Sequence, residues 1–166
     1  MKNFYTLLLV AFCSLASFAQ EENVTTYYLI RHAEKSLFDA GDNDPVLSLD
    51  GINRAKKWVS IFENTKFDAI YSTDYKRTKL TAKPIATANK IPTYKFDQTK
   101  MYDDAFKFMT KGKTVLVVGH SNTTPQLANM ILGAEKYQEI DDTKYGNLYI
   151  ITVIGDKASG VLLNLE

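Results

Sequence analysis

Short apolar runs rich in β-branched and aromatic residues alternate along this chain with longer segments whose apolar positions recur every three or four residues. The first kind of pattern predicts strands and the second predicts helices. The predicted strands are residues 24–31, 67–72, 93–96, 114–119, 147–154 and 160–165. The predicted helices are residues 48–62, 74–89, 101–111 and 121–132. Strand–helix alternation of this kind is typical of α/β proteins.

The apolar periodicity also predicts which side chains face the core. For the first helix these are Ile52, Ala55, Val59 and Phe62, and for the third they are Met101, Ala105, Phe108 and Met109. Ser48 is expected to cap the first helix. Residues 35–47, which are rich in Gly, Asp and Asn, are expected to form a loop.

The segment TVLVVG (114–119) is apolar on both of its faces, which predicts a central parallel strand. Together with the alternation of elements, this predicts a doubly wound, mostly parallel sheet in a three-layer α/β/α sandwich. In such sheets ligands bind at the carboxyl ends of the strands. A functional site is therefore expected where these strands give way to loops.

Length and charge limit the classes of function. The chain has 166 residues, 45% of them hydrophobic, and a net charge of +1, which suits one globular domain over residues 20–166. A balance so close to neutral does not predict binding to nucleic acid or to a charged membrane surface. No segment suggests a metal site, and no cofactor is predicted.

Residues 1–19 have the layout of a secretory signal peptide: Lys2 near the start, an apolar stretch, and small residues before Gln20. The apolar stretch is short for a membrane anchor. Cleavage would remove Cys13, which is the single cysteine, and leave 19 basic and 19 acidic residues. We therefore expect an exported protein, periplasmic or secreted, with no disulfide and no stable membrane anchor after processing.

The basic residues that best suit anion chemistry fall at predicted strand ends. The chain has two histidines, and His32 and His120 each follow a predicted strand directly. Of its three arginines, Arg31 adjoins His32 and Arg77 begins the helix after the second strand, whereas Arg54 is expected on the solvent face of the first helix. Guanidinium groups hold phosphate in a two-pronged manner. These residues, if gathered at one sheet edge, would suit a phosphoryl group.

Four segments carry a resemblance to a known family, the histidine phosphatase superfamily, also called phosphoglycerate mutase-like. They are Arg31-His32-Ala33-Glu34-Lys35, DPVLSLDGINRAK (44–56), YSTDYKRTKLTAKPIA (71–86) and VLVVGHSNTTPQLANMILG (115–133). Their order and spacing agree over residues 26–133. Ala33 stands where most members have glycine, so the backbone there is expected to avoid positive φ or to accept strain.

The resemblance implies a phosphohistidine mechanism. His32 would be the nucleophile that attacks phosphorus and forms a covalent intermediate, which water then cleaves. Arg31, Arg77 and a cationic His120 would hold the phosphoryl oxygens. Backbone N–H groups around Ser121 and Asn122, at a helix N-terminus, would add further donors.

Two further site residues are less defined by the resemblance. Many members have an acidic proton donor in a segment after the second helix, and here Asp97 is the first candidate, followed by Asp103 and Glu34. The family also often has a polar phosphate ligand after the first signature, for which Asn43 or Ser36 is available.

The function that these residues imply is hydrolysis of phosphate monoesters by a secreted phosphatase. Its partner would be a phosphorylated small molecule or a phosphoprotein. The alternatives are a phosphoglycerate mutase-type phosphotransferase and a phospho-ligand binding domain without turnover. The chain has little sequence for a lid that would exclude water, which favours hydrolysis over phosphoryl exchange.

Overall fold

The structure is a computed structural model, and it describes residues 23–38 and 41–166. The predicted signal peptide lies outside these residues. The strands are β1 (Val24–Arg31), β2 (Ala69–Ser72), β3 (Thr93–Lys95), β4 (Thr114–Gly119), β5 (Asn147–Ile154) and β6 (Lys157–Asn164). The helices are α2 (Leu49–Ile61), α3 (Lys76–Asn89), α4 (Asp104–Thr110) and α5 (Thr123–Leu132).

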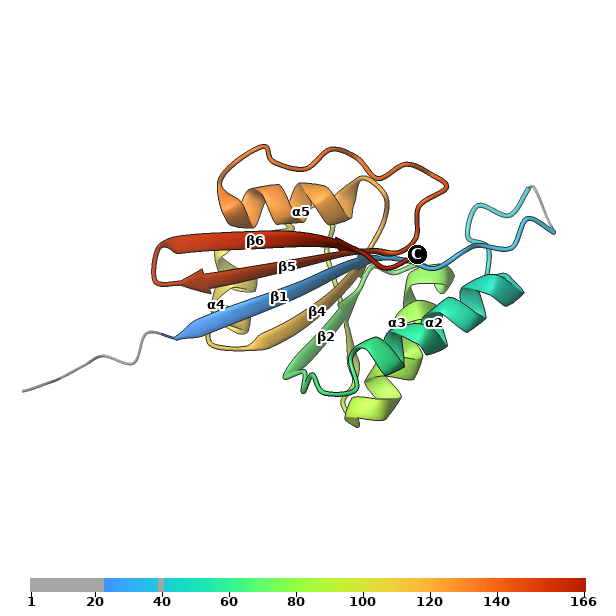
Figure 1. Cartoon of the computed structure of the whole chain (residues 1–166), viewed down its shortest axis with the longest axis horizontal. Coiled ribbons are helices and arrows are strands. Elements are labelled where there is room, and N and C mark those ends of the chain that lie inside the picture. The colour runs from blue at the N-terminus through green and yellow to red at the C-terminus, as the bar shows by residue number, and fades with distance from the viewer. Residues whose placement is uncertain (1–22, 39–40) are drawn as a thin grey trace, which may run out of the picture.

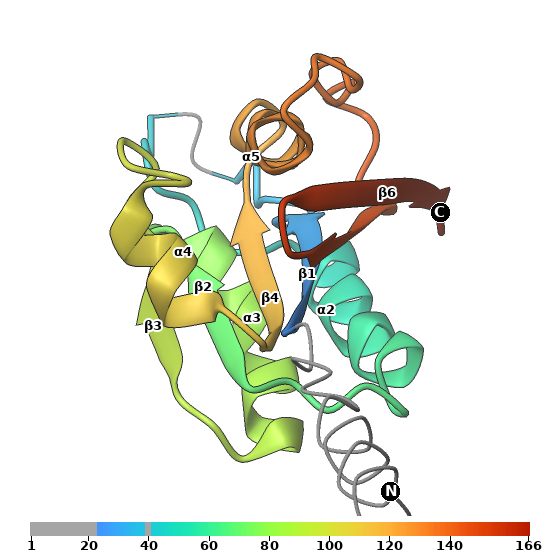
Figure 2. The ribbon, with the colours of Figure 1, turned by 90° about the vertical axis from the view of Figure 1, so that its left-hand side faces the viewer.

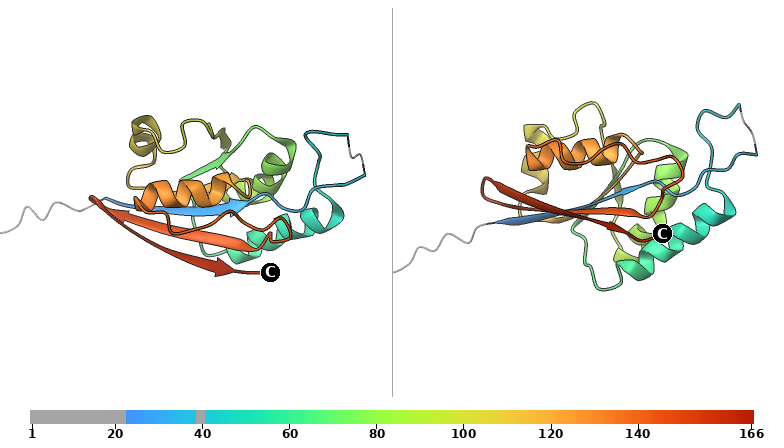
Figure 3. Two further views of the ribbon diagram at one scale, coloured as in Figure 1. Left: turned by 90° about the horizontal axis from the view of Figure 1, so that it is seen from above. Right: turned by 45° about the horizontal axis from the view of Figure 1, so that its top comes forward.

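These strands form one sheet in the order β3-β2-β4-β1-β5-β6; Figure 1 labels the strands from β2 to β6, and Figure 2 labels β3 beside β2. Neighbours among β3, β2, β4 and β1 are parallel, and β5 and β6 continue the sheet as an antiparallel hairpin. Figures 2 and 3 show helices on both sides of the sheet. The predicted mostly parallel α/β sandwich is confirmed, with β4 and β1 at its centre.

Alternate side chains of the central strands fill two separate cores. On one face Leu29 and Val117 pack with residues of α4 and α5, such as Phe106 and Leu127. The alternate positions of the same strands point to the other face of the sheet. There they pack with residues of α2 and α3, such as Trp58 and Ile85. Because side chains of a strand alternate between faces, an apolar run in β4 serves both cores at once.

The N-terminus of α2 packs directly on the loop that follows β1. Ser48 caps the helix by accepting a hydrogen bond from the Gly51 N–H at 3.1 Å, and its own N–H donates to the Glu34 carbonyl at 2.9 Å. A Cβ at position 51 would overlap that Glu34 carbonyl oxygen. Gly51 therefore permits a close approach that fixes the backbone just beyond His32.

The backbone at Ala33 avoids positive φ, which is one of the two outcomes that the sequence analysis expects. Among the described residues, Lys90 is the one non-glycine residue with positive φ. Ala33 is fully buried in a small cluster with Leu47 and Ala55. Its methyl group therefore has a packing function, and its backbone is not in the left-handed region.

Two predicted helix faces are wrong in part. In α4 the inward side chains are Phe106 and Thr110, whereas Phe108 is 83% exposed. The helix begins only after Asp103, whose carboxylate accepts a hydrogen bond from the Phe106 N–H, and stacking of Phe106 beside Tyr27 sets its rotation. In α2 the inward residues include Trp58, while Ile52 is half exposed.

Met109, which was also expected to face the core, is 47% exposed. The last strand begins at Lys157, three residues earlier than expected, because a tight turn with Gly155 at φ 56 closes the hairpin. Over residues 23–38 and 41–166, no helix has the length and apolar character that a membrane crossing requires.

We expect Gly51→Ala to lower the free energy of unfolding by about 1–3 kcal/mol, because the added methyl group meets a backbone carbonyl that cannot move aside. At an open helical position the same change would instead stabilise the helix by about 1 kcal/mol. Urea unfolding measures the difference. Asn53→Ala, at an exposed position of the same helix, is the control and should change little. A more stable Gly51→Ala protein would contradict the close approach.

Candidate active site

The parallel pairing of β1 with β4 brings the two histidines together. Arg31 lies opposite Gly119 in the register, and the His32 N–H donates to the Gly119 carbonyl at 2.9 Å. His120 follows Gly119 directly, so the two imidazole rings lie with their centroids 5.4 Å apart. They stand at the carboxyl edge of the sheet, as the sequence predicts.

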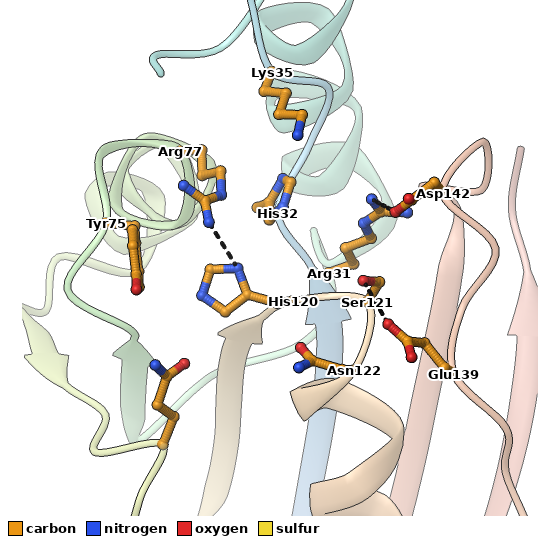
Figure 4. A pocket seen from close by; sticks show the side chains of 11 residues that line it. Arg31, His32, Lys35, Tyr75, Arg77, His120, Ser121, Asn122, Glu139 and Asp142 are labelled. Carbon is orange, nitrogen blue, oxygen red and sulfur yellow. Dashed lines mark hydrogen bonds and ion pairs between the residues drawn. The ribbon is translucent and has the colours of Figure 1, made fainter. Parts of the chain in front are cut away.

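An open pocket of about 330 Å³ surrounds the histidines (Figure 4). Arg77 reaches it from the first turn of α3, and Tyr75 precedes that helix. Of the predicted site residues, five line this pocket: Arg31, His32, Arg77, His120 and Ser121. The gathering of both histidines with two arginines agrees with the arrangement that the sequence suggests.

The imidazole of His32 is held in one tautomer. Its Nδ1 lies 2.8 Å from the carbonyl oxygen of Ala33, which can only accept, so Nδ1 carries the proton and Nε2 is left unprotonated. The Ala33 N–H donates in turn to the Thr81 hydroxyl of α3 at 2.9 Å. Burial, reinforced by nearby positive groups, lowers the pKa of His32 to about 3. The ring is therefore neutral at physiological pH, as a nucleophile must be.

His120 is oriented by a chain of buried hydroxyl groups. Its Nε2 lies 2.9 Å from the Thr73 hydroxyl, which donates to the Thr78 hydroxyl at 3.0 Å, and Thr78 donates to backbone carbonyls. Because each hydroxyl has one proton to give, His120 Nε2 carries the proton. Burial and the neighbouring arginines lower the pKa of His120 to about 4. The resting ring is thus neutral, whereas the sequence analysis expects a cation.

The Arg31 guanidinium is held by the loop between α5 and β5. Its Nη1 donates to the carbonyl oxygens of Asp141 and Lys144, both at 2.9 Å, and Nη2 donates to the Asp142 carboxylate at 3.0 Å. The Tyr145 ring lies 4.3 Å from its central carbon. The buried Nε–H has no partner in the part of the chain that the structure describes. One donor edge of this arginine is therefore left for another acceptor.

Arg77 is held more loosely. Its guanidinium lies 4.4 Å from the centre of the Tyr75 ring and 3.5 Å from an Asp44 carboxylate oxygen. The same oxygen accepts the Lys76 N–H at 2.9 Å. Arg77 Nη2 also lies 3.5 Å from His120 Nδ1. A bound anion could draw Arg77 closer without breaking a buried hydrogen bond.

None of the three predicted proton donors lines the pocket. Asp97 is exposed, and hydrogen bonds from the Thr99 hydroxyl and N–H lower the pKa of its carboxyl. Asp103 caps α4, and Glu34 accepts from Arg54 Nε at 2.7 Å. The assignment of Asp97 stays a prediction that its position does not favour.

The predicted phosphate ligands of the first loop also lie elsewhere. Asn43 is exposed and does not line the pocket, and the Ser36 hydroxyl accepts the Phe38 N–H at 3.3 Å. Their binding function stays a prediction. Arg54 does not face solvent as expected, because its partly buried guanidinium bridges Glu34 and Glu166.

Four pocket residues escaped the sequence analysis, namely Lys35, Gln98, Glu139 and Asp142, whereas Asn122 lines the pocket beside Ser121 as expected. Their signal in the sequence is weak, since polar residues in loops are common. Glu139 and Asp142 come from the loop before β5, which reaches the site because β5 runs antiparallel to β1. Among the described residues no cluster of three or more His, Cys, Asp or Glu could hold a metal ion.

The two neutral histidines predict a pH dependence of stability. In the unfolded chain each takes up a proton below its ordinary pKa near 6.5, whereas in the folded state it resists protonation down to about pH 4 or 3. The unfolded state thus binds more protons in this window. The free energy of unfolding should fall with decreasing pH between 6.5 and 4, by roughly 1.4 kcal/mol per pH unit for each proton difference.

Urea unfolding at several pH values in phosphate-free buffer measures this slope. His120→Asn should make the slope shallower, because one of the two groups is removed. A profile that is flat between pH 6.5 and 4.5 for the unchanged protein would show that the histidines are not kept neutral.

Comparisons with known proteins agree with the geometry. The sequence pattern of the histidine phosphatase superfamily (branch 1) matches residues 27–99, which include the first histidine and Arg77. No curated protein sequence matches the chain. Solved structures match at low sequence identity, which speaks to the fold alone.

Three of these structures illustrate the likeness. An alpha-ribazole phosphatase from Shigella flexneri has a TM-score of 0.64 at 15% identity, covering 84% of this chain and 96% of the other. The protein histidine phosphatase SixA in complex with tungstate has a TM-score of 0.65 at 14% identity, with coverage of 84% and 96%. A mutant phosphoserine phosphatase from Entamoeba histolytica in complex with phosphoserine has a TM-score of 0.63 at 16% identity, with coverage of 82% and 95%.

The matched pattern ends before His120, but the fold places that second histidine beside the first. Both arginines of the expected anion clamp line the same pocket. Pattern and site geometry therefore agree: over residues 27–99 the chain matches the histidine phosphatase superfamily (branch 1), and its fold is that of the solved structures named above.

Proposed function

We propose that this protein hydrolyses phosphate monoesters through a covalent phosphohistidine on His32. The observation that carries the proposal is the tautomer of His32. Its Nδ1–H is bound to the Ala33 carbonyl, so that the lone pair of Nε2 is available in a pocket lined by two arginines. A neutral imidazole with a fixed ring is prepared for attack on phosphorus.

The reaction has two steps. Nε2 of His32 forms a bond to phosphorus while the bond to the ester oxygen breaks, and the electron pair leaves with that oxygen. Water then attacks the phosphohistidine, the N–P bond breaks, and its electrons return to Nε2. The Ala33 carbonyl supports the first step because it stabilises the positive charge that the phosphorylated ring carries.

Arg31 and Arg77 would supply the charge that the transferring group needs. On Arg31 the Nε–H and the remaining Nη2–H lie along one edge of the guanidinium, and such an edge fits two phosphoryl oxygens. A buried donor without a partner costs free energy, so an anion that accepts from it binds with an advantage. Arg77 would contact a further oxygen from the opposite wall.

His120 would join the clamp only when the substrate arrives. With its proton on Nε2, the neutral ring presents a bare Nδ1 beside Arg77. A phosphate dianion in the pocket favours the cationic form, which can then donate from Nδ1. A substrate monoanion could instead donate its own proton to Nδ1, and both routes give the same hydrogen-bonded pair.

The substrate would be a phosphorylated small molecule or a phosphoprotein. The pocket is open, with polar walls, which suits a phosphoryl group presented at the end of a larger molecule. The structural neighbours include proteins named for alpha-ribazole, protein histidine and phosphoserine dephosphorylation. Their variety supports a phosphatase more than any single substrate.

A phospho-ligand binding domain without turnover is the second candidate. It is favoured by one observation, that none of the three predicted proton donors lines the pocket. Such a domain would keep the arginine clamp and bind phosphate without cleaving esters.

Turnover of p-nitrophenyl phosphate by the protein without residues 1–19 tests the proposal. His32→Ala should lower kcat by at least about 1,000-fold, because the attacking nitrogen is lost. Lys113→Ala, at the amino end of β4, removes a positive charge far from the pocket and should leave the rate unchanged. Phosphate binding without any turnover between acidic and neutral pH would favour the binding domain.

The intermediate can be observed directly. Rapid quench under alkaline conditions preserves phosphohistidine, which acid would destroy. Phosphate bound covalently to the unchanged protein and absent from His32→Ala is the expected outcome. Its appearance in both proteins would exclude His32 as the nucleophile.

We propose in addition that the protein is exported and cleaved before Gln20, on the basis of the signal-like layout of residues 1–19. When the full chain is expressed in a bacterium, the protein should appear in the exported fraction. Its mass should be that of a chain whose first residue is Gln20. A chain that stays membrane-bound with its first residues intact would contradict this.

A further inference from the structure

We propose that Glu139 is the general acid that protonates the leaving group, an inference that rests on the proposed phosphatase function. The residue lies in the loop between α5 and β5, far in sequence from the segment in which the sequence analysis expects a donor. Its side chain lines the same pocket as His32 and His120 (Figure 4).

Two hydrogen bonds join the segment that carries Glu139 to Ser121. Glu139 Oε1 accepts from the Ser121 hydroxyl at 3.3 Å, and the N–H of the next residue, Ile140, donates to the Ser121 carbonyl at 2.9 Å. Ile140 is buried and anchors the segment in the core. Because Ser121 follows His120 directly, the carboxyl group is tied to the part of the site that would hold the phosphoryl oxygens.

The other acidic residues are less suited to the task. Within the described residues the pocket has two carboxyl groups, Glu139 and Asp142. Asp142 accepts from Arg31 Nη2 and would lose that ion pair on taking up a proton. Asp97 does not line the pocket.

Glu139 has one oxygen, Oε2, for which no hydrogen bond within the described residues is seen. In the first step this carboxyl group gives its proton to the ester oxygen as the P–O bond breaks and the Nε2–P bond forms. The products are an alcohol, phosphohistidine and a carboxylate. In the second step the carboxylate takes a proton from the attacking water, which restores the acid.

The assignment predicts a class of substrate. A phenol such as p-nitrophenol leaves readily as an anion, whereas an alkyl alcohol leaves only when its oxygen receives a proton. A site with a positioned acid is therefore suited to phosphate esters of aliphatic alcohols, such as those of sugars and hydroxy amino acids.

The experiment compares two substrates in each protein variant, with kcat/KM as the readout, since this constant reports the first irreversible step. For methyl phosphate, Glu139→Gln should lower kcat/KM by about 100-fold or more, the usual contribution of a general acid. For p-nitrophenyl phosphate it should remain nearly unchanged, which also shows that the variant is folded. Glu135→Gln, four residues earlier and outside the pocket, is the matched control.

Equal losses on both substrates would overturn the inference, because they indicate a binding or structural function for Glu139. A selective loss in Asp97→Asn and none in Glu139→Gln would overturn it in favour of the donor expected from the sequence. Each of these outcomes leaves the proposed phosphatase function intact. If the unchanged protein cleaves neither ester, the proposed function itself fails, and this inference fails with it.

Discussion

The register between β1 and β4 is the constraint on which the site depends. The strands pair in parallel from Thr26 opposite Thr114 to Arg31 opposite Gly119, and both are buried on two faces. A shift of one residue would exchange the two faces of a strand and replace the side chains that fit each core. The fit of apolar side chains in the two cores therefore also fixes the distance between His32 and His120.

Bringing so many ionisable groups together costs free energy. The structure lowers this cost by keeping the histidines uncharged and by pairing the arginines with acceptor groups. Both histidines are kept neutral by burial. The charge of Arg31 is balanced by two carbonyl groups, a carboxylate and an aromatic face, and that of Arg77 by Asp44 and Tyr75. The resting pocket is thus less positive than two arginines and two charged histidines would make it. Under the proposed function, a phosphate would meet arginine donors that are already in place, and the resting site would not hold strongly repelling cations.

The sequence predicts those features that depend on short patterns. The boundaries of β1 and β5 follow from β-branched and aromatic runs, and the placing of His32 and His120 follows from strand ends. The face of α4 could not be predicted, because its seven residues hold apolar side chains on more than one side and packing against Tyr27 decides between them. The ion pair between Arg54 and Glu166 joins residues that are 112 positions apart in the sequence (166 − 54). No local sequence pattern could have predicted it.

The loop before β5 shows most clearly why the site could be predicted only in part. In a wholly parallel sheet, segments that follow strands reach the carboxyl edge. Here β5 runs antiparallel to β1, so Leu148 lies opposite Ile30 and the residues before the strand reach that edge instead. The segment that contains Glu139 and Asp142 thus contacts Ser121 and Arg31 only because one strand is reversed. The sheet core fixes the histidines and arginines, while a loop without regular structure supplies the carboxyl groups around them. Under the proposed function, changes in that loop would alter which esters are accepted without disturbing the groups proposed to hold phosphorus.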